Sequence, residues 1–229
     1  MKSITKDIII SCEEDPTGIF PMINRGEFEL VDYLLDNGIV NINTVDSNGN
    51  DVLVRLLKVK EYNLVLKYIK KKNWDVNHQN KEGDTFGHIL ASDSSVSTIK
   101  IIDALLKKTS FMPNIRNYKG ETLFDRANNN NYLITSLKIL EDKRFTNIDL
   151  YDFKSLCDSI FNNKYGSYSM LSNFNLIINS MKKKPLLPNM QLLIDRLYEN
   201  KEAIKLDINN NSLDLFDKIF SLTIEEIGV

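Results

Sequence analysis

The most informative feature of the hydrophobic pattern is a phrase that occurs three times between residues 26 and 120. Each phrase has Leu, Ile and Val at helical spacing, then a polar loop, then a turn that contains a glycine. Each turn glycine follows a loop asparagine by six residues, in the pairs Asn43 and Gly49, Asn77 and Gly83, and Asn114 and Gly120. Successive glycines are 34 and 37 residues apart. Periods of this length are typical of stacked repeat proteins.

The apolar positions predict the helices of each phrase. We expect helices over residues 27–37, 52–58, 64–69, 85–91 and 99–106, and a less regular fourth phrase over 120–140. Gly38 is expected to adopt the left-handed conformation that ends the first of these helices. The 37-residue step places three extra residues in the polar run 92–97, which predicts a longer connection there. Such short helix pairs cannot bury their apolar faces alone, so we expect them to stack.

The period is no longer evident after Leu140, although amphipathic patterns continue. They predict helices over residues 149–162, 169–181, 189–204 and 212–222, with Pro185 and Pro188 breaking the chain before the third. The chain is therefore expected to be all-α, with repeats and an N-terminal helix in residues 1–141. Residues 142–229 form an all-helical C-terminal region, interpreted either as diverged repeats or as a cap with a polar outer face.

These phrases resemble ankyrin repeats. Residues 85–91, Thr-Phe-Gly-His-Ile-Leu-Ala, are similar to the Thr-Pro-Leu-His-x-Ala opening of that family. Residues 26–38 resemble its second helix and terminating glycine, and residues 75–80 resemble the loop that follows. The resemblance covers roughly residues 18–141 and implies an ankyrin-type solenoid of about four stacked helix pairs.

The repeats depart from the family pattern at their helix openings. Val52, Phe86 and Leu123 stand where the family has proline, and the second repeat has Asp51 where the family has threonine. His88 matches the family histidine, and the resemblance implies that its side chain braces neighbouring turns by a hydrogen bond. The repeats are therefore classified as degenerate.

Composition and charge narrow the class of protein. With 42% hydrophobic and 26% charged residues the chain has the composition of a folded soluble protein. A net charge of −2 argues against a nucleic-acid-binding protein, which needs a basic face, but it leaves a local basic patch open. Cys12 and Cys157 are too few for a secreted disulfide scaffold, and the apolar run 8–10 is too short for a signal peptide or membrane span. We expect an intracellular protein, in cytoplasm or nucleus, with no membrane partner.

Nothing in the sequence predicts catalysis. His78 and His88 are the only histidines, and neither has cysteines or carboxylates at zinc-binding spacing. The chain has no glycine-rich phosphate loop, no nucleophile elbow and no paired-carboxylate signature. We therefore expect no enzymatic activity, no cofactor and no metal.

Two further features have alternative interpretations. Trp74 follows the basic run 70–72, and its ring either packs under the loop or is an exposed anchor in a binding surface. The lysine runs 70–72 and 182–184 are interpreted as solvated helix ends, favoured by the negative end of the helix dipole. The alternative for these lysines is a nuclear-import or phosphate-binding role.

The leading functional hypothesis is a non-catalytic module that binds another protein, or a peptide segment of one, as a monomer or as a subunit of a hetero-complex. The resemblance implies contacts at the turn tips and the inner helices. The candidate tip residues are Ser47, Asn48, Asn50, Lys81, Glu82, Tyr118 and Lys119. Beside them we place Arg55, Ser92 and Asp93 on the inner helices, and Trp74. The alternative hypothesis is a structural or regulatory arm of a larger assembly, such as a fragment of a transcription or chromatin regulator.

Overall fold

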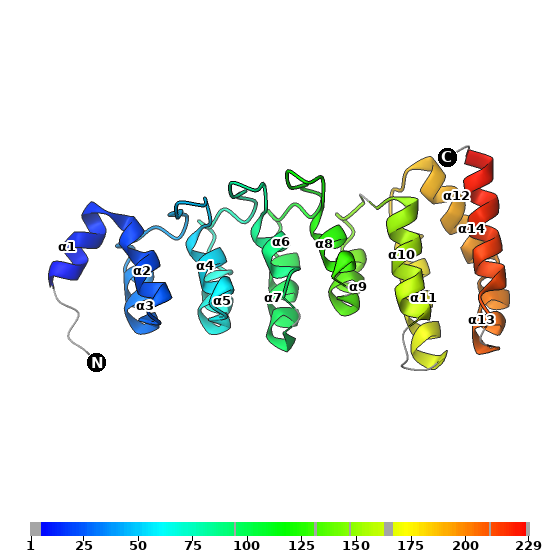
Figure 1. The fold of residues 1–229 in the computed structure, drawn as a ribbon, viewed down its shortest axis with the longest axis horizontal. Helices are drawn as coiled ribbons and strands as arrows, with labels where there is room; N and C mark the ends of the chain where they lie inside the picture. The colour runs from blue at the N-terminus through cyan, green and yellow to red at the C-terminus, as the bar shows by residue number, and fades with distance from the viewer. Residues whose placement is uncertain are drawn as a thin grey trace. The chain divides into compact units, whose positions relative to one another are not determined.

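The structure is a computed structural model that describes residues 6–93, 95–130, 132–146, 148–162, 167–210 and 212–227. Within these residues the chain forms α-helices and one short 3-10 helix, and no strand (Figure 1). The prediction of an all-α protein is confirmed. No helix in this part of the chain has the length and apolar character needed to cross a bilayer. The chain divides into two compact units, Met1–Leu123 and Phe124–Val229.

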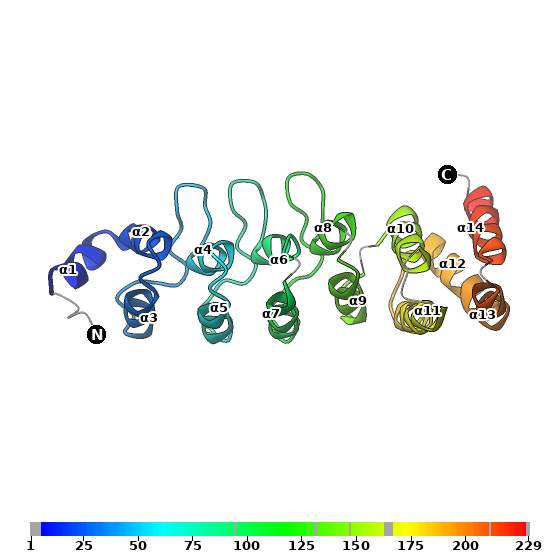
Figure 2. The same cartoon turned by 60° about the horizontal axis from the view of Figure 1, so that its bottom comes forward.

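The first unit is built from helix pairs. Its helices are α1 (Lys6–Glu14), α2 (Ile19–Asn24), α3 (Phe28–Asp36), α4 (Val52–Lys58), α5 (Tyr62–Tyr68), α6 (Phe86–Leu90) and α7 (Val96–Leu106), with the 3-10 helix η1 (Pro16–Gly18) between α1 and α2. In each pair the first helix packs on the second: α2 on α3, α4 on α5 and α6 on α7. Figure 2 shows α2, α4 and α6 in one row and α3, α5 and α7 in the other.

Helix α4 shows why the pairs stack. Its buried side chains are Val52, Leu53, Val54, Leu56 and Leu57. A helix that is apolar on nearly every face must be covered on nearly every face, and α4 contacts α2, α5 and α6. Each of these side chains stabilises the fold by about 2 kcal/mol through its removal from water.

Local signals in the sequence set the helix ends. Asp51 begins α4, and its carboxylate accepts a hydrogen bond from the Val54 N–H at 2.7 Å. Gly38 has φ +69°, and the Ile39 N–H donates to the Leu34 carbonyl, which closes the end of α3 as predicted. The connection between α6 and α7 spans residues 91–95, against 59–61 between α4 and α5. The longer connection therefore overlaps the predicted run 92–97, but it is two residues longer and not three, and residues 96 and 97 of that run belong to α7.

The polar loops end in three turns of the same backbone form, which we call tips 1, 2 and 3 (residues 46–50, 80–84 and 117–121). In each tip the glycine N–H donates to the carbonyl of the first residue at 2.9 Å. The first residue in turn donates its N–H to the carbonyl of the fifth, at 2.9 to 3.0 Å. The glycines Gly49, Gly83 and Gly120 have φ of +75°, +75° and +80°, which residues with a Cβ rarely adopt.

The second unit is a separate helical bundle. Its helices are α9 (Leu133–Glu141), α10 (Leu150–Phe161), α11 (Ser167–Met181), α12 (Pro188–Glu199), α13 (Lys201–Asn209) and α14 (Asp214–Ile227), and α8 (Leu123–Asn129) begins at the last residue of the first unit. Helix α11 contacts α9, α10, α12 and α13, so it forms the centre of the bundle. Phe161, Phe174 and Phe216 pack with ring centroids 5.1 to 6.5 Å apart at its core.

Two sequence-based expectations for this unit are wrong. The predicted helix 189–204 is two helices, which meet at Asn200. The Asn200 side chain donates to the Arg196 carbonyl at 2.8 Å, and such local hydrogen bonds compete with a continuous helix. Lys184, expected at a solvated helix end, is 6% exposed and donates to the carbonyls of Asp142 and Phe145 at 2.5 and 2.7 Å. Burial lowers the pKa of Lys184 to about 8.

The three tip glycines are expected to differ in their tolerance of alanine. A Cβ on Gly83 would lie 2.6 Å from the Tyr118 nitrogen and 2.7 Å from its ring, whereas a Cβ on Gly120 meets no atom within 4 Å. Gly120→Ala is expected to lower the free energy of unfolding by about 1–2 kcal/mol, the cost of the left-handed conformation alone. Gly83→Ala adds a further cost of about 1–3 kcal/mol because Tyr118 must move. Urea denaturation measures both, and equal losses would contradict the close packing of tips 2 and 3.

Candidate functional site

The tips are held by side chains as well as by backbone hydrogen bonds. The first residue of each tip is Asp46, Asn80 or Asn117. Its Oδ1 accepts from the N–H groups two and four residues later, at 2.8 to 3.0 Å. One side chain therefore satisfies two backbone donors that no helix or sheet could pair. The backbone of each tip is consequently held in one conformation.

Neighbouring tips are also bonded to each other. The Lys81 N–H donates to the Asn48 carbonyl at 3.0 Å, and the Tyr118 N–H donates to the Glu82 carbonyl at 3.1 Å. Side chains also bond neighbouring tips to each other. The Asn80 amide donates to Asn50 Oδ1 at 3.0 Å, and the Asn117 amide donates to Asp84 Oδ1 at 2.7 Å. The three tips of the first unit therefore form one bonded row.

The recurring loop asparagines of the first two phrases bond each loop to the loop of the next phrase. The Asn43 side chain donates to the Asn73 carbonyl at 2.7 Å and accepts from the Asp75 N–H at 2.8 Å. Asn77 makes the same pair of bonds one phrase later, to the Ser110 carbonyl at 2.7 Å and the Met112 N–H at 2.9 Å. We call Asn43 and Asn77 the bridging asparagines. A primary amide carries both the donor and the acceptor that this bridge needs.

Most of the predicted tip residues are exposed on this row. They are Ser47 and Asn48 on tip 1, Lys81 and Glu82 on tip 2, and Tyr118 and Lys119 on tip 3. The Tyr118 side chain is 76% exposed, and its ring lies close against the α-carbon of Gly83. A large aromatic ring is thus presented to solvent on a backbone that is fixed from both sides.

Two residues of the predicted surface are instead buried. Asn50 is 1% exposed, because its side chain is bonded within tip 1 and to Asn80. Trp74 is 3% exposed: its ring packs edge-on against Phe86 at 5.1 Å, and its indole N–H donates to Asp51 Oδ2 at 2.8 Å. Burial raises the pKa of Asp51, although the hydrogen bond from Trp74 opposes this shift. Neither Asn50 nor Trp74 can serve as an exposed contact in this structure.

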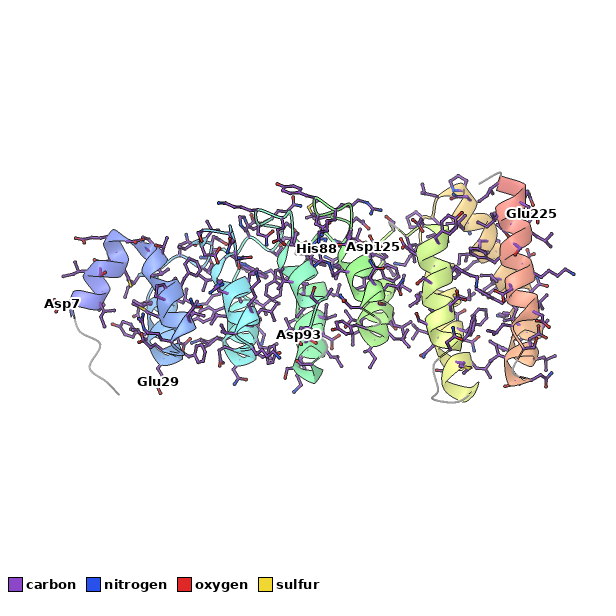
Figure 3. All side chains as sticks on the ribbon, in the orientation of Figure 1. Asp7, Glu29, His88, Asp93, Asp125 and Glu225 are labelled. Carbon is purple, nitrogen blue, oxygen red and sulfur yellow. The ribbon has the colours of Figure 1, made fainter. Side chains whose placement is uncertain are left out.

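The predicted inner-helix residues lie apart from one another. Arg55 on α4 is half-buried, bonded to Asn24 Oδ1 at 2.5 Å and 3.6 Å from the Asp46 carboxylate. Figure 3 shows His88 near the tip end of α6 and Asp93 at the opposite end of that pair. Asp93 accepts from the Tyr62 hydroxyl at 2.6 Å, and the Ser92 hydroxyl donates to the His88 carbonyl at 3.1 Å. The structure therefore brings Arg55, but not Asp93, towards the tips.

His88 braces two phrases of the first unit. Its Nδ1 accepts the Thr85 N–H at 3.1 Å, and its Nε2 lies 2.8 Å from the Glu121 carbonyl. The second contact requires the proton on Nε2, since a carbonyl can only accept. His88 is 1% exposed, and no group of three potential metal-binding side chains occurs in the described part of the chain. These hydrogen bonds give the His88 side chain a structural role.

The sequence interpretation missed Arg116. Its side chain is exposed and donates to the Gly120 carbonyl, which fixes the guanidinium on tip 3. The role of Asp46, Asn80 and Asn117 was also missed. The signal was present, because these three residues keep the 34- and 37-residue spacing of the glycines.

Removing a bridging asparagine is expected to loosen the loop of the next phrase. Asn77→Ala loses both bonds to the segment 110–112 and is expected to lower the free energy of unfolding by about 2 kcal/mol, at about 1 kcal/mol for each bond. Amide hydrogen exchange at Met112 should accelerate at the same time. Asn63→Ala is the matched control, because Asn63 is exposed and makes no side-chain hydrogen bond to the described residues. Equal effects of the two substitutions would contradict the bridging role.

In a comparison with known proteins, no protein-family model and no curated protein matches the chain. The function is therefore inferred from the tips and their neighbours alone.

Proposed function

We propose that this chain is an ankyrin-type repeat protein that binds another protein, without catalysis, through its row of tips. The observation that carries the proposal is the common geometry of the three tips. Each has the same backbone bonds, the same side-chain acceptor at its first residue and a left-handed glycine. A backbone built identically three times, with different side chains at its exposed positions, is suited to recognition.

The helix pairs of the first unit support the assignment to ankyrin-type repeats. First helices pack against first helices (α2, α4 and α6), and second helices pack against second helices (α5 and α7). Thr85 and His88 form the capping box at the start of α6, and the resemblance places the family threonine and histidine at these two positions. In such a stack each pair buries its apolar face against its neighbours.

The tip row has the properties of a binding surface. Ordering flexible groups at an interface reduces affinity, and the bonds within and between the tips have already fixed this backbone. Tyr118 supplies a large amphipathic contact at low entropic cost, and tyrosine is enriched among interface hot spots. Lys81, Glu82 and Lys119 surround it with charges of both signs. The surface therefore combines one aromatic anchor with a polar rim.

Alanine at Lys81, Glu82, Tyr118 and Lys119 together tests this proposal. All four side chains are exposed, so their removal should leave the thermal midpoint nearly unchanged. The partner is first identified by affinity purification with the unmodified chain and mass spectrometry, and its affinity is then measured with purified components. We expect the fourfold variant to bind at least about tenfold more weakly, as loss of one hot spot predicts.

The matched control carries alanine at Lys143, Tyr151, Glu199 and Lys218. This set has the same residue types and is also exposed, but it lies in the second unit. The control is expected to bind as the unmodified chain does. Full binding by the tip variant, or equal losses in both variants, would overturn the assignment of the site to the tips.

A further inference from the structure

We propose a second interaction surface, separate from the tips: an edge of lysines on the second-helix row that binds a glutamate- or aspartate-rich segment of a partner protein. The lysine edge consists of Lys70, Lys71, Lys72, Lys107 and Lys108. The first three follow α5 and the other two follow α7, and these helices are neighbours in one row (Figure 2). The proposal does not depend on the function of the tips.

The inner part of the lysine edge is fixed by contacts. Lys108 Nζ donates to the Lys71 carbonyl at 3.0 Å and lies 5.4 Å from the centre of the Trp74 ring. Burial lowers the pKa of the Lys108 ammonium. Lys71 Nζ lies 3.6 Å from Asp36 on α3. These contacts join the ends of α5 and α7, so the outer lysines stand on a rigid base.

The outer lysines provide the binding charge. Lys70, Lys72 and Lys107 are exposed, and none of them makes an ion pair with another residue in the described part of the chain. The nearby carboxylates of α3 are already engaged: Asp32 and Asp36 bind Lys67 at 2.7 and 2.6 Å. The edge is thus a local positive field on a chain whose net charge is −2.

The chemistry of the edge favours peptide carboxylates over other polyanions. It contains no arginine, the residue whose planar fork matches phosphate groups. Its aromatic neighbours Trp74 and Tyr68 are buried, so no ring is exposed to stack on a nucleic-acid base.

The spacing of the edge predicts the spacing of the acidic residues. Lys70 and Lys107 follow the ends of two packed helices, whose axes are about 8–10 Å apart in general. A peptide in the extended polyproline II conformation advances about 3.1 Å per residue and brings every third side chain to the same face, so carboxylates three residues apart would reach both lysines. The expected ligand is therefore an extended segment with an acidic residue at every third position.

The proposal is tested with a fluorescein-labelled peptide that carries glutamate at every third position among glycine and serine. Fluorescence anisotropy with the full chain should show binding at about 0.15 M salt that weakens as salt rises. The same peptide with glutamine should bind at least about tenfold more weakly. Trp74 is the only tryptophan and lies beneath Lys108, so binding of an unlabelled peptide should change its emission.

Charge-removing variants locate the site. The variant K70Q/K72Q/K107Q should bind the glutamate peptide at least about tenfold more weakly. The control K143Q/K183Q/K218Q removes the same charge from exposed lysines of the second unit and should bind within about twofold of the unmodified chain. A loss of affinity in K81Q/K119Q without a loss in the edge variant would overturn the proposal. Tighter binding of single-stranded RNA or phosphatidylserine vesicles than of the glutamate peptide would also overturn it.

Discussion

The first unit depends on how the polar groups of its irregular backbone are satisfied. Between each second helix and the next first helix the chain runs through a long loop and a tip, where N–H and carbonyl groups lack helical partners. Short polar side chains at fixed positions provide the partners. Asp46 and its equivalents close each tip from within, and the bridging asparagines tie each loop to the next. The stack therefore needs these side-chain-to-backbone bonds in addition to its apolar core.

Asp51 joins these polar bonds to the core. One carboxylate oxygen caps α4, and the other accepts the indole N–H of Trp74 from the next loop. The Trp74 ring also packs edge-on against Phe86 of α6, so three successive parts of the chain meet at one buried carboxylate. Burial of this charge is costly, and its pKa is raised accordingly, but the two donors offset part of the cost. At the equivalent positions Thr85 and Thr122 the sequence uses a neutral hydroxyl.

Much of this architecture follows from sequence, because it is encoded by local signals that recur. Helix periodicity, the terminating Gly38 and the three tip glycines depend on backbone geometry within a few residues. The predictions from sequence fail where contacts between distant parts of the chain determine whether a residue is buried. Trp74 comes shortly after three lysines, and its neighbours in the sequence are polar. Its ring is nevertheless covered by α6. Asn50 is buried, unlike Asn48, because its side chain is bonded both within tip 1 and to Asn80 of the neighbouring tip. The break at Asn200 interrupts a helical pattern that is otherwise continuous. No local pattern distinguishes such cases.

The contrast between repeated and variable positions bears on function. Some positions keep the same chemistry in all three phrases: the tip glycines and the residues that begin each tip. These residues form the hydrogen bonds that set the backbone conformation of the tips. The two positions between them differ each time: Ser and Asn, then Lys and Glu, then Tyr and Lys. These variable side chains make few bonds within the chain and face solvent. If recognition is the function, its specificity belongs to them, because the recurring residues could not change without loss of the frame that presents them. The same reasoning separates Lys108, fixed over Trp74, from Lys107 beside it, which makes no ion pair with the residues that the structure describes.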